Sequence, residues 1–577
     1  MAANVPGLEL APMGKEPGSL TYDTGKDTDL DHVEHKSHDL DGLDVTVPPE
    51  LDAIRSAWDD LSFKQSLRLF WRGVLVCFLA GFSSFTDGYQ IAIVGNIIGF
   101  EGFIKQFGTD INPETGGPML AADVLSAWTA VGSVMQWCGM TLFPFIADKF
   151  GRKWCMISYW IIIAAGVAAE CGAREWRAWL AAKMFVGLGV GAMQFCMQVY
   201  ITEMSPTAKV RGAMLSLYNF WQVSSPPTWV TGMFIGTITI TMLRNHDQNN
   251  WLKVIYSEWS QVGIMGIIYV FCLPESTWWY ARQDKHDKGI KSLHRLYHKI
   301  PGYDAEVEYA IIRRTVEHER AFAIANKEVS YMSILKGVNG WRTFVASYEL
   351  LTATFVGQSF LSTYVVLFFE IAGSTNAFTN TCITSGLGIA CTVFLILFLD
   401  KFGRRRIICY GISTMWLSLF LIGCIGLVKN PSKSLNGLLI FLACLWTVCF
   451  NIGNGAGWAM IGEVPSSRLR AKTAGFAASI PVAFGIGIGY GTPYMISTTD
   501  LNWGLKTCFF FAGVSFPLVV GLWFIIPEVK GRSAAELDEM FELKVKPWRF
   551  RKYVTEVERT RTAKGNDEQV AAGAQAA

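Results

Sequence analysis

Long apolar segments, separated by short polar ones, dominate the chain. A transmembrane helix needs about 20 mostly apolar residues to cross a bilayer, so each such segment predicts one membrane-spanning helix. Six of them lie at 70–98, 124–146, 154–172, 178–202, 214–241 and 259–273, and six more lie at 344–370, 378–399, 407–428, 438–461, 473–496 and 506–526. The pattern therefore predicts an all-α membrane protein with twelve transmembrane helices in two groups of six.

A charged stretch lies between the two groups. Its apolar residues recur at helical spacing, which predicts short amphipathic helices outside the bilayer. We therefore expect an N-terminal six-helix bundle over 66–273, a helical linker over 274–340 and a C-terminal six-helix bundle over 341–527.

The two ends of the chain differ in charge. Residues 1–65 are acidic and poor in aromatic side chains, which predicts a disordered tail. Residues 528–577 contain the basic run "KVKPWRFRKYVTEVERTR". Its mixture of basic and aromatic residues predicts a surface helix on anionic lipid, and contact with a regulatory protein is the alternative.

Three motifs occur once in each half and in the same order. "DKFGRK" at 148 corresponds to "DKFGRRR" at 400, "EMSPTAKVRG" at 203 to "EVPSSRLRAK" at 463, and "PES" at 274 to "PEVKGRS" at 527. Three ordered matches at nearly one spacing indicate parallel repeats. Such repeats are typical of transporters in which two bundles rock about a site near the bilayer midplane.

Basic residues gather in the short loops that carry these motifs. The positive-inside rule places those loops, and with them both termini, in the cytoplasm. Gly151 and Gly403 permit a tight turn that brings acidic and basic side chains together. We predict ion pairs that close the cytoplasmic face, and the alternative is that the loops only fix topology. The predicted gating residues are Asp148, Arg152, Glu203, Arg211, Asp400, Arg404, Glu463 and Arg470.

Composition excludes several other functions. Only 17% of residues are charged, against about 25% in ordinary globular proteins. The 13 cysteines are scattered without a metal-ligand spacing, and the eight histidines lie in polar stretches, so we expect no metal site and no intramembrane histidine relay. With no nucleophile and base, phosphate loop or nucleic-acid module, the chain predicts neither an enzyme nor a cofactor.

Together these motifs resemble the sugar porter family of the major facilitator superfamily over residues 70–545. "PESTWWYARQDK" and "GQSFLSTYVVLFFEIAGSTNAF" are similar to fungal α-glucoside (maltose-type) permeases. The resemblance implies a monomeric, multi-pass plasma-membrane transporter that works by alternating access and takes up a sugar such as an α-glucoside, another disaccharide or a hexose. A facilitative uniporter and a transport-deficient sugar sensor are the alternatives.

Coupling to protons depends on helix 1. The family carries an aspartate within GYDT, whereas this chain has Gln90 there and Asp87 one turn earlier. Lys183 matches the family's helix-4 arginine, so the hypothesis is that Asp87 carries the proton and Lys183 acts on its charge. A static salt bridge between the two is one alternative. The amide of Gln90 favours the other, a uniporter.

A sugar site needs amides and hydroxyls to bond the sugar hydroxyls, and an aromatic ring to pack against the apolar face of the sugar. Gln222 matches the family's helix-5 glutamine and Trp458 its helix-10 tryptophan. In helix 7 the family's glutamine pair is replaced by Ala353 and Thr354, and its asparagine by Ser359. The predicted substrate-binding residues are Gln90, Gln222, Gln358, Ser359, Tyr364, Asn454 and Trp458.

Overall fold

The computed structural model of the chain is mainly helical in its described part. It describes residues 58, 63–111, 116–205, 229–325, 331–371, 377–428, 432–466, 469–497, 499–530, 532, 534–555 and 559. The predicted disorder of the N-terminal tail falls almost entirely outside these residues. Within the range given to that tail, Trp58 packs on Phe70 with ring centroids 5.8 Å apart.

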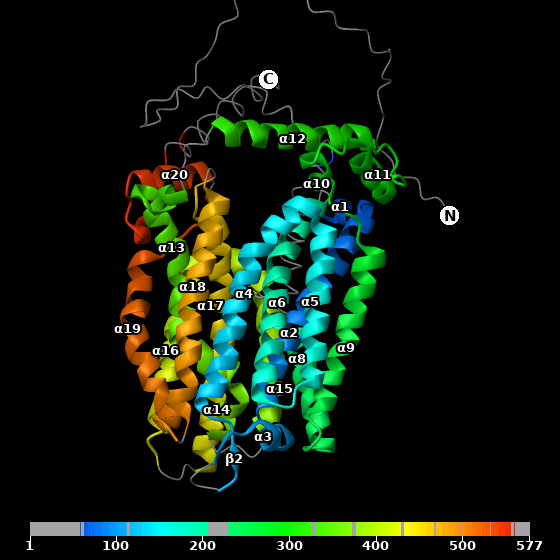
Figure 1. Cartoon of the computed structure of the whole chain (residues 1–577). Coiled ribbons are helices and arrows are strands. Elements are labelled where there is room, and N and C mark those ends of the chain that lie inside the picture. Colours follow the sequence, from blue (N-terminus) through cyan, green and yellow to red (C-terminus); the bar gives the residue numbers. More distant parts are fainter. Residues whose placement is uncertain are drawn as a thin grey trace, which may run out of the picture. The chain divides into compact units, whose positions relative to one another are not determined.

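The N-terminal half contains long helices and one short hairpin. Its elements are α1 (Phe63–Leu69), α2 (Trp71–Ile97), α3 (Glu101–Phe107), the antiparallel strands β1 (Asp110–Ile111) and β2 (Pro118–Met119), α4 (Ala122–Phe150), α5 (Arg152–Gly172), α6 (Trp176–Met204), α8 (Trp229–His246), α9 (Leu252–Ile267) and the π-helical turn η3 (Ile268–Cys272). Helix α4 packs on α6, α2 on α8, and α5 on α6 (Figure 1).

The linker and the C-terminal half follow. Their elements are α10 (Thr277–Arg282), α11 (His286–Tyr297), α12 (Ala305–Ala325), the 3₁₀ turn η4 (Tyr331–Leu335), α13 (Gly337–Ala353), the π-helical segment η5 (Thr354–Thr363), α14 (Val365–Ile371), α15 (Ala377–Phe402), α16 (Arg404–Ile425), α17 (Lys433–Glu463), α18 (Arg470–Ile496), η6 (Gly504–Lys506), α19 (Thr507–Ile525), α20 (Ala534–Glu542) and η7 (Pro547–Arg549). The two halves meet through α4 against α18 and α8 against α15.

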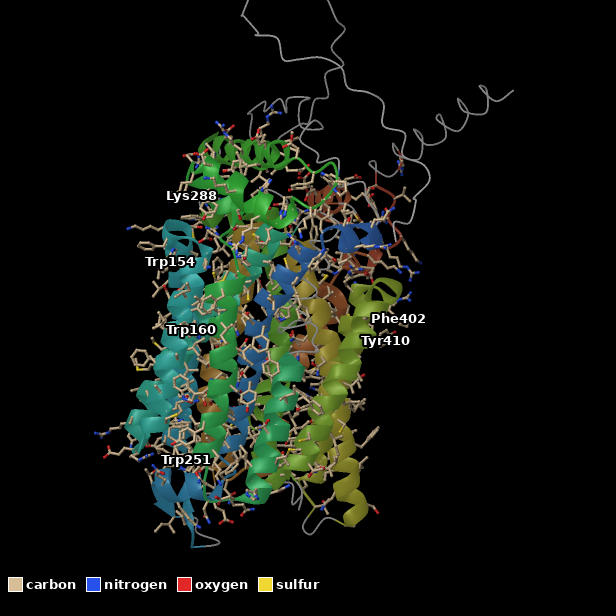
Figure 2. All side chains as sticks on the ribbon, turned by 90° about the vertical axis from the view of Figure 1, so that its right-hand side faces the viewer. Trp154, Trp160, Trp251, Lys288, Phe402 and Tyr410 are labelled. Carbon is tan, nitrogen blue, oxygen red and sulfur yellow. The ribbon has the colours of Figure 1, made fainter. Side chains whose placement is uncertain are left out.

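Nine segments of the described chain are long and apolar enough to span a membrane. The other three predicted spans correspond to α8, to the helix α13–η5–α14 and to α15. Figure 2 shows Trp154 and Tyr410 on the outside of the helices, where each side chain is 63% exposed. Large aromatic rings on an outer surface suit contact with lipid.

Two predicted boundaries need correction. The sixth span begins at Leu252 rather than 259, because the polar residues Lys253 and Glu258 hide the start of α9 from a hydropathy criterion. The seventh is not one continuous helix, since Gly357 has φ of +82° and interrupts it. The indole N–H of Trp446 donates to the carbonyl oxygen of Val356 at 3.1 Å and so satisfies a backbone group beside the break.

The linker helices pack on the start of the first membrane helix, as amphipathic helices should. Leu293 and Tyr297 of α11 are buried with Phe70, and a Cβ on Gly73 would overlap the Tyr297 hydroxyl. The basic tail, by contrast, was predicted as a surface helix, and this is wrong for its described part. It folds back as the turn η7, with Phe550 packed on Phe541 at 5.2 Å.

Candidate transport site

A chain of amides holds the candidate proton carrier in the N-terminal bundle. Asp87 on α2 is fully buried. Gln194 on α6 donates from Nε2 to Oδ2 of Asp87 at 2.7 Å, and Gln136 on α4 donates from Nε2 to Oε1 of Gln194 at 2.9 Å. Three helices are thereby joined through one carboxylate and two amides.

A second buried cluster contains three ionisable groups. Gln90 donates from Nε2 to Oε2 of Glu258 on α9. Lys183 on α6 forms an ion pair with Glu170 on α5, with Nζ 2.6 Å from Oε1. Glu258 interacts electrostatically with both Glu170 and Lys183. The cluster thus buries two carboxyls with one ammonium group, and because an uncompensated buried charge is costly, it is suited to hold a proton.

The predicted action of Lys183 on Asp87 stays a prediction, because the ion pair that Lys183 forms is with another acid. Lys183 pairs with Glu170, and the residue of α6 that contacts Asp87 is Gln194. Gln194 lies eleven positions after Lys183 in the sequence, which is about 16 Å along a helix at 1.5 Å per residue. The charge of Lys183 therefore acts on Glu170 and Glu258. Neither acid is among the residues that the sequence predicts for the site.

The repeated loop motifs are each capped by the acid of the repeated "PE" motif. Glu275 accepts hydrogen bonds from the backbone N–H of Arg152 at 2.8 Å and of Lys153 at 3.1 Å. In the other half, Glu528 accepts one from the backbone N–H of Arg404 at 3.0 Å. Both acids lie at the first turn of a helix, where unpaired N–H groups favour an anion. Burial raises the pKa of Glu275, and these hydrogen bonds oppose that shift.

The glycine of each loop leaves room for its capping acid. Gly151 has φ of +106° and Gly403 has φ of +86°. A Cβ on Gly151 would overlap the carboxyl of Glu275, and a Cβ on Gly403 that of Glu528. The two halves therefore repeat one structural unit of glycine turn, helix start and capping acid.

We predict that Gly151→Ala lowers both thermal stability and transport. The left-handed region costs an L-residue about 1–2 kcal/mol, and displacement of Glu275 adds to that cost. Gly263→Ala is the matched control, because Gly263 lies in α9 with open space at its Cβ position. The thermal midpoint of the purified protein measures the effect, and equal midpoints for the two variants would contradict the capping role.

The ion pairs of the predicted gate link helices within one bundle. Arg152 Nη2 lies 2.9 Å from Glu203 Oε1 and 3.1 Å from Asp148 Oδ1, and Arg404 Nη2 lies 2.9 Å from Glu463 Oε1. Arg211 lies outside the described residues, as do the side chains of Asp400 and Arg470. The proposed gating role of these eight residues stays a prediction.

Glu203 also ties the linker to the N-terminal bundle. Its Oε1 lies 2.7 Å from Arg282 Nη1 on α10, and its Oε2 accepts a hydrogen bond from the Ser276 hydroxyl at 2.5 Å. Trp279 of α10 donates from its indole N–H to the carbonyl oxygen of Asp148 at 2.9 Å. A movement of the loop at 148–153 therefore has to move the linker as well.

The predicted sugar-binding residues are only partly brought together. Tyr364 shares a hydrogen bond with Thr129 at 2.7 Å, between helices of opposite halves. Gln358, Asn454 and Trp458 are half-buried on η5 and α17. Gln222 and the side chain of Ser359 lie outside the described part of the chain. The structure thus places Gln90 beside Glu258, in the cluster that also contains Glu170 and Lys183, and Tyr364 at a contact between the halves.

Comparison with known proteins decides the family. A family model for "Sugar (and other) transporter" matches residues 76–541. The chain belongs to this family. It is a multi-pass membrane transporter with the major facilitator fold, and its likeness to the xylose transporter XylE from E. coli in the inward-open conformation has a TM-score of 0.62 at 17% identity, covering 81% of this chain and 99% of that one.

Two fungal relatives match the transporter over nearly its whole length. The MFS transporter fmqE of Aspergillus fumigatus is 25% identical over 90% of this chain and 96% of that protein. The general alpha-glucoside permease of Saccharomyces cerevisiae is 27% identical over 90% of this chain and 85% of that protein. These relatives confirm the resemblance that the sequence motifs indicated.

Several polar residues of the site were not found from the sequence. Glu258 was placed just outside its helix by the hydropathy criterion. Glu170 carried a signal, since it is an acid within an apolar window, as did the glutamines Gln136 and Gln194. Which of these side chains meet follows only from the packing of α2, α4, α5, α6 and α9.

Proposed function

We propose that the transporter takes up a sugar across the plasma membrane by alternating access and couples uptake to protons through Asp87. The observation that carries coupling is the pair of fully buried carboxyls, Asp87 and Glu258, each of which accepts a hydrogen bond from a neutral amide. An amide donor satisfies a carboxylate without neutralising it. Such a group can therefore gain and lose a proton as the access of water changes.

A sugar as the substrate is supported by the family description and by the alpha-glucoside permease among the relatives. The sugar would bind between the halves, where Tyr364 meets Thr129 and where Trp458 offers an aromatic ring.

We propose that both termini and the linker face the cytoplasm, because the loops that carry the DKFGR motifs are basic.

The alternating movement uses the repeated loops. In each half the arginine of the motif joins a second helix of the same bundle, Glu203 for Arg152 and Glu463 for Arg404. Each bundle end is therefore a rigid unit that can approach or leave the other. In the N-terminal half the linker moves with that unit through Arg282.

Facilitative uniport is the second candidate, and Gln90 favours it. An amide at this position lacks a titratable proton, and the Gln90 amide already donates a hydrogen bond to Glu258. A uniporter equilibrates its sugar, whereas a symporter concentrates it.

An uptake panel tests the proposed function. Transporter-null cells that express the chain would be given radiolabelled monosaccharides, disaccharides and organic acids, with and without a protonophore. We expect accumulation of one sugar class above its external concentration, and collapse of that accumulation with the protonophore. Equilibration without accumulation would support the uniporter, and uptake of organic acids alone would contradict the sugar proposal.

Trp458→Ala is predicted to weaken sugar binding. The loss of one buried aromatic contact costs about 1–3 kcal/mol, so the apparent affinity should fall while expression stays normal. Trp154→Ala is the control, because Trp154 faces outward on α5 (Figure 2). Unchanged affinity in the Trp458→Ala variant would assign this residue to helix packing.

A further inference from the structure

A buried acid in the C-terminal bundle takes no part in the proposed transport function. Glu349 lies on α13 and its side chain is 1% exposed. Neither of its carboxyl oxygens has a hydrogen-bond partner among the described residues. This distinguishes it from Asp87, Glu170 and Glu258, each of which has a polar partner.

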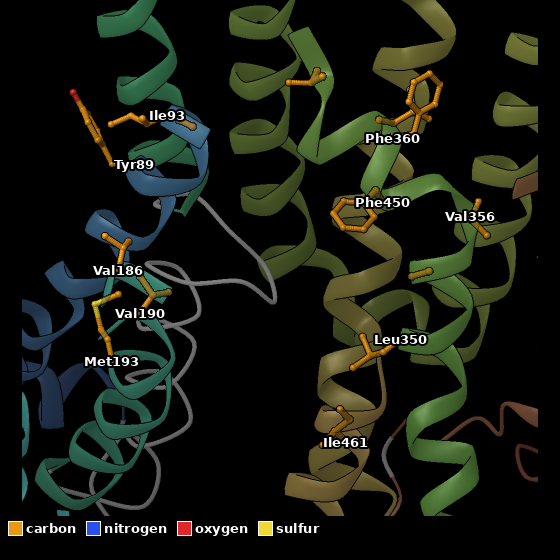
Figure 3. Packing of buried hydrophobic residues seen from close by; sticks show 14 of the residues in the cluster. Tyr89, Ile93, Val186, Val190, Met193, Leu350, Val356, Phe360, Phe450 and Ile461 are labelled. Carbon is orange, nitrogen blue, oxygen red and sulfur yellow. The ribbon is translucent and has the colours of Figure 1, made fainter. Parts of the chain in front are cut away.

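The carboxyl of Glu349 points into the contact between α13 and α17. A Cβ on Gly457 of α17 would overlap this carboxyl, so the glycine provides the space that the acid occupies. Figure 3 shows α13 and α17 side by side, with Leu350 and Ile461 packed at the same contact. Trp458, whose ring is proposed to pack against the sugar, is the residue that follows Gly457.

The charged groups of the surrounding elements are engaged elsewhere or lie at helix ends. On α16 and α17, Arg404 pairs with Glu463, and Arg405 donates to backbone carbonyls of Trp523 and Ile526. On α13 itself, Arg342 pairs with Asp538 of α20. Tyr348 is the other titratable residue of α13. The remaining titratable residues on elements packed against α13 are Tyr331, Arg406, Cys409, Tyr410, Cys424, Lys433, Cys444, Cys449, Arg470, Lys472, Tyr490, Tyr494, Cys508, Glu536, Glu539 and Glu542.

The carboxyl is buried in the contact between the two helices, and no hydrogen bond from a described residue compensates it. An ionised carboxylate in such a place costs several kcal/mol, and the neutral acid is the form that fits a dry contact between two helices. Ionisation therefore requires water, and a movement of α13 away from Gly457 would let water reach the group.

We propose that Glu349 is a proton-binding site in the C-terminal bundle, and that its protonated form holds α13 against α17. Loss of the proton loosens this contact next to Trp458. The inference rests on the proposed transport function and adds a second proton to it, bound in the half opposite Asp87. Proton binding and sugar binding would then be linked through adjacent positions of α17.

The first test observes the proton directly in the wild-type protein. Infrared difference spectra of the full-length protein in liposomes, recorded across a pH series, should show the carbonyl band of a protonated carboxyl that Glu349→Gln removes. Glu170→Gln is the matched control, because Glu170 is paired with Lys183 and should contribute no such band. If the Gln variant does not fold, Glu349→Asp should shift the band. Absence of the band at every pH would overturn the proposal.

The second test measures transport. In the Asp87→Asn background, sugar counterflow should still fall about tenfold per pH unit once Glu349 ionises. Addition of Glu349→Gln should make counterflow insensitive to pH over that range. An unchanged pH profile in the double variant would overturn the link to transport. If the wild-type protein moves no sugar at all, the proposed function fails, yet the infrared titration still decides whether Glu349 binds a proton.

Discussion

Arg152→Ala is expected to reduce transport far more than Arg404→Ala, although the two residues occupy the same place in the repeated motif. The Arg152 side chain is 3% exposed and its partner Glu203 6% exposed, whereas Arg404 and Glu463 are 14% and 35% exposed. Removal of one partner from a buried pair costs about 3–5 kcal/mol, and the contribution of an ion pair falls as its exposure to water rises, to about 1 kcal/mol or less for a fully exposed pair. The N-terminal copy should therefore lose most of its turnover and part of its thermal stability.

Lys149→Ala is the matched control for this comparison. Lys149 belongs to the same motif, lies in the last turn of α4, carries the same charge and is exposed. Initial uptake rates, normalised to the amount of transporter at the membrane, measure the effect on turnover. Equal rates for Arg152→Ala and Lys149→Ala would show that the buried pair neither positions the linker nor takes part in gating.

The fold was predictable because hydropathy and repetition are local properties of a sequence. An apolar window of about 20 residues marks a span wherever it lies, and the three repeated motifs identified the two halves before any contact was known. The same reasoning failed where a span contains polar groups. Because Lys253 and Glu258 are polar, hydropathy placed the start of α9 too late in the sequence. Gly357 has a positive φ and interrupts a helix that hydropathy predicts as continuous.

The site was less predictable because partners are chosen by packing. Lys183 was assigned to Asp87 by analogy, yet α6 is long enough to present Lys183 to Glu170 and, three turns later, Gln194 to Asp87. Likewise, the sequence shows that "PES" and "PEVKGRS" are repeated motifs, but it does not show what their glutamates do. Each acid caps the helix which follows the glycine of its own half.

The halves share loops but differ in their buried charges. The N-terminal bundle buries Asp87, Glu170, Lys183 and Glu258, whereas among the described membrane helices of the C-terminal bundle Glu349 is buried without a cation. The proposed proton sites thus differ, because the N-terminal one lies within a network of partners and the C-terminal one is surrounded by apolar packing. Variants in the two halves should accordingly have separable effects on accumulation and on the pH profile of exchange.

Asp87→Asn should abolish accumulation of sugar and preserve counterflow exchange, because a neutral amide resembles the protonated carboxyl and still lets the loaded carrier reorient. Glu258→Gln is the matched variant. Glu258 already shares its surroundings with Lys183 and Glu170, so loss of its charge leaves a balanced pair and should spare most of the accumulation.

Accumulation ratios and sugar-driven acidification, measured in one vesicle preparation for both variants, separate the possibilities. If Glu258→Gln loses accumulation while Asp87→Asn retains it, the coupled proton resides at Glu258, beside Gln90. Should the wild-type protein only equilibrate its sugar and Asp87→Asn transport normally, the transporter is a uniporter. In that event the hydrogen bond from Gln194 to Asp87 serves only to join α2 to α6.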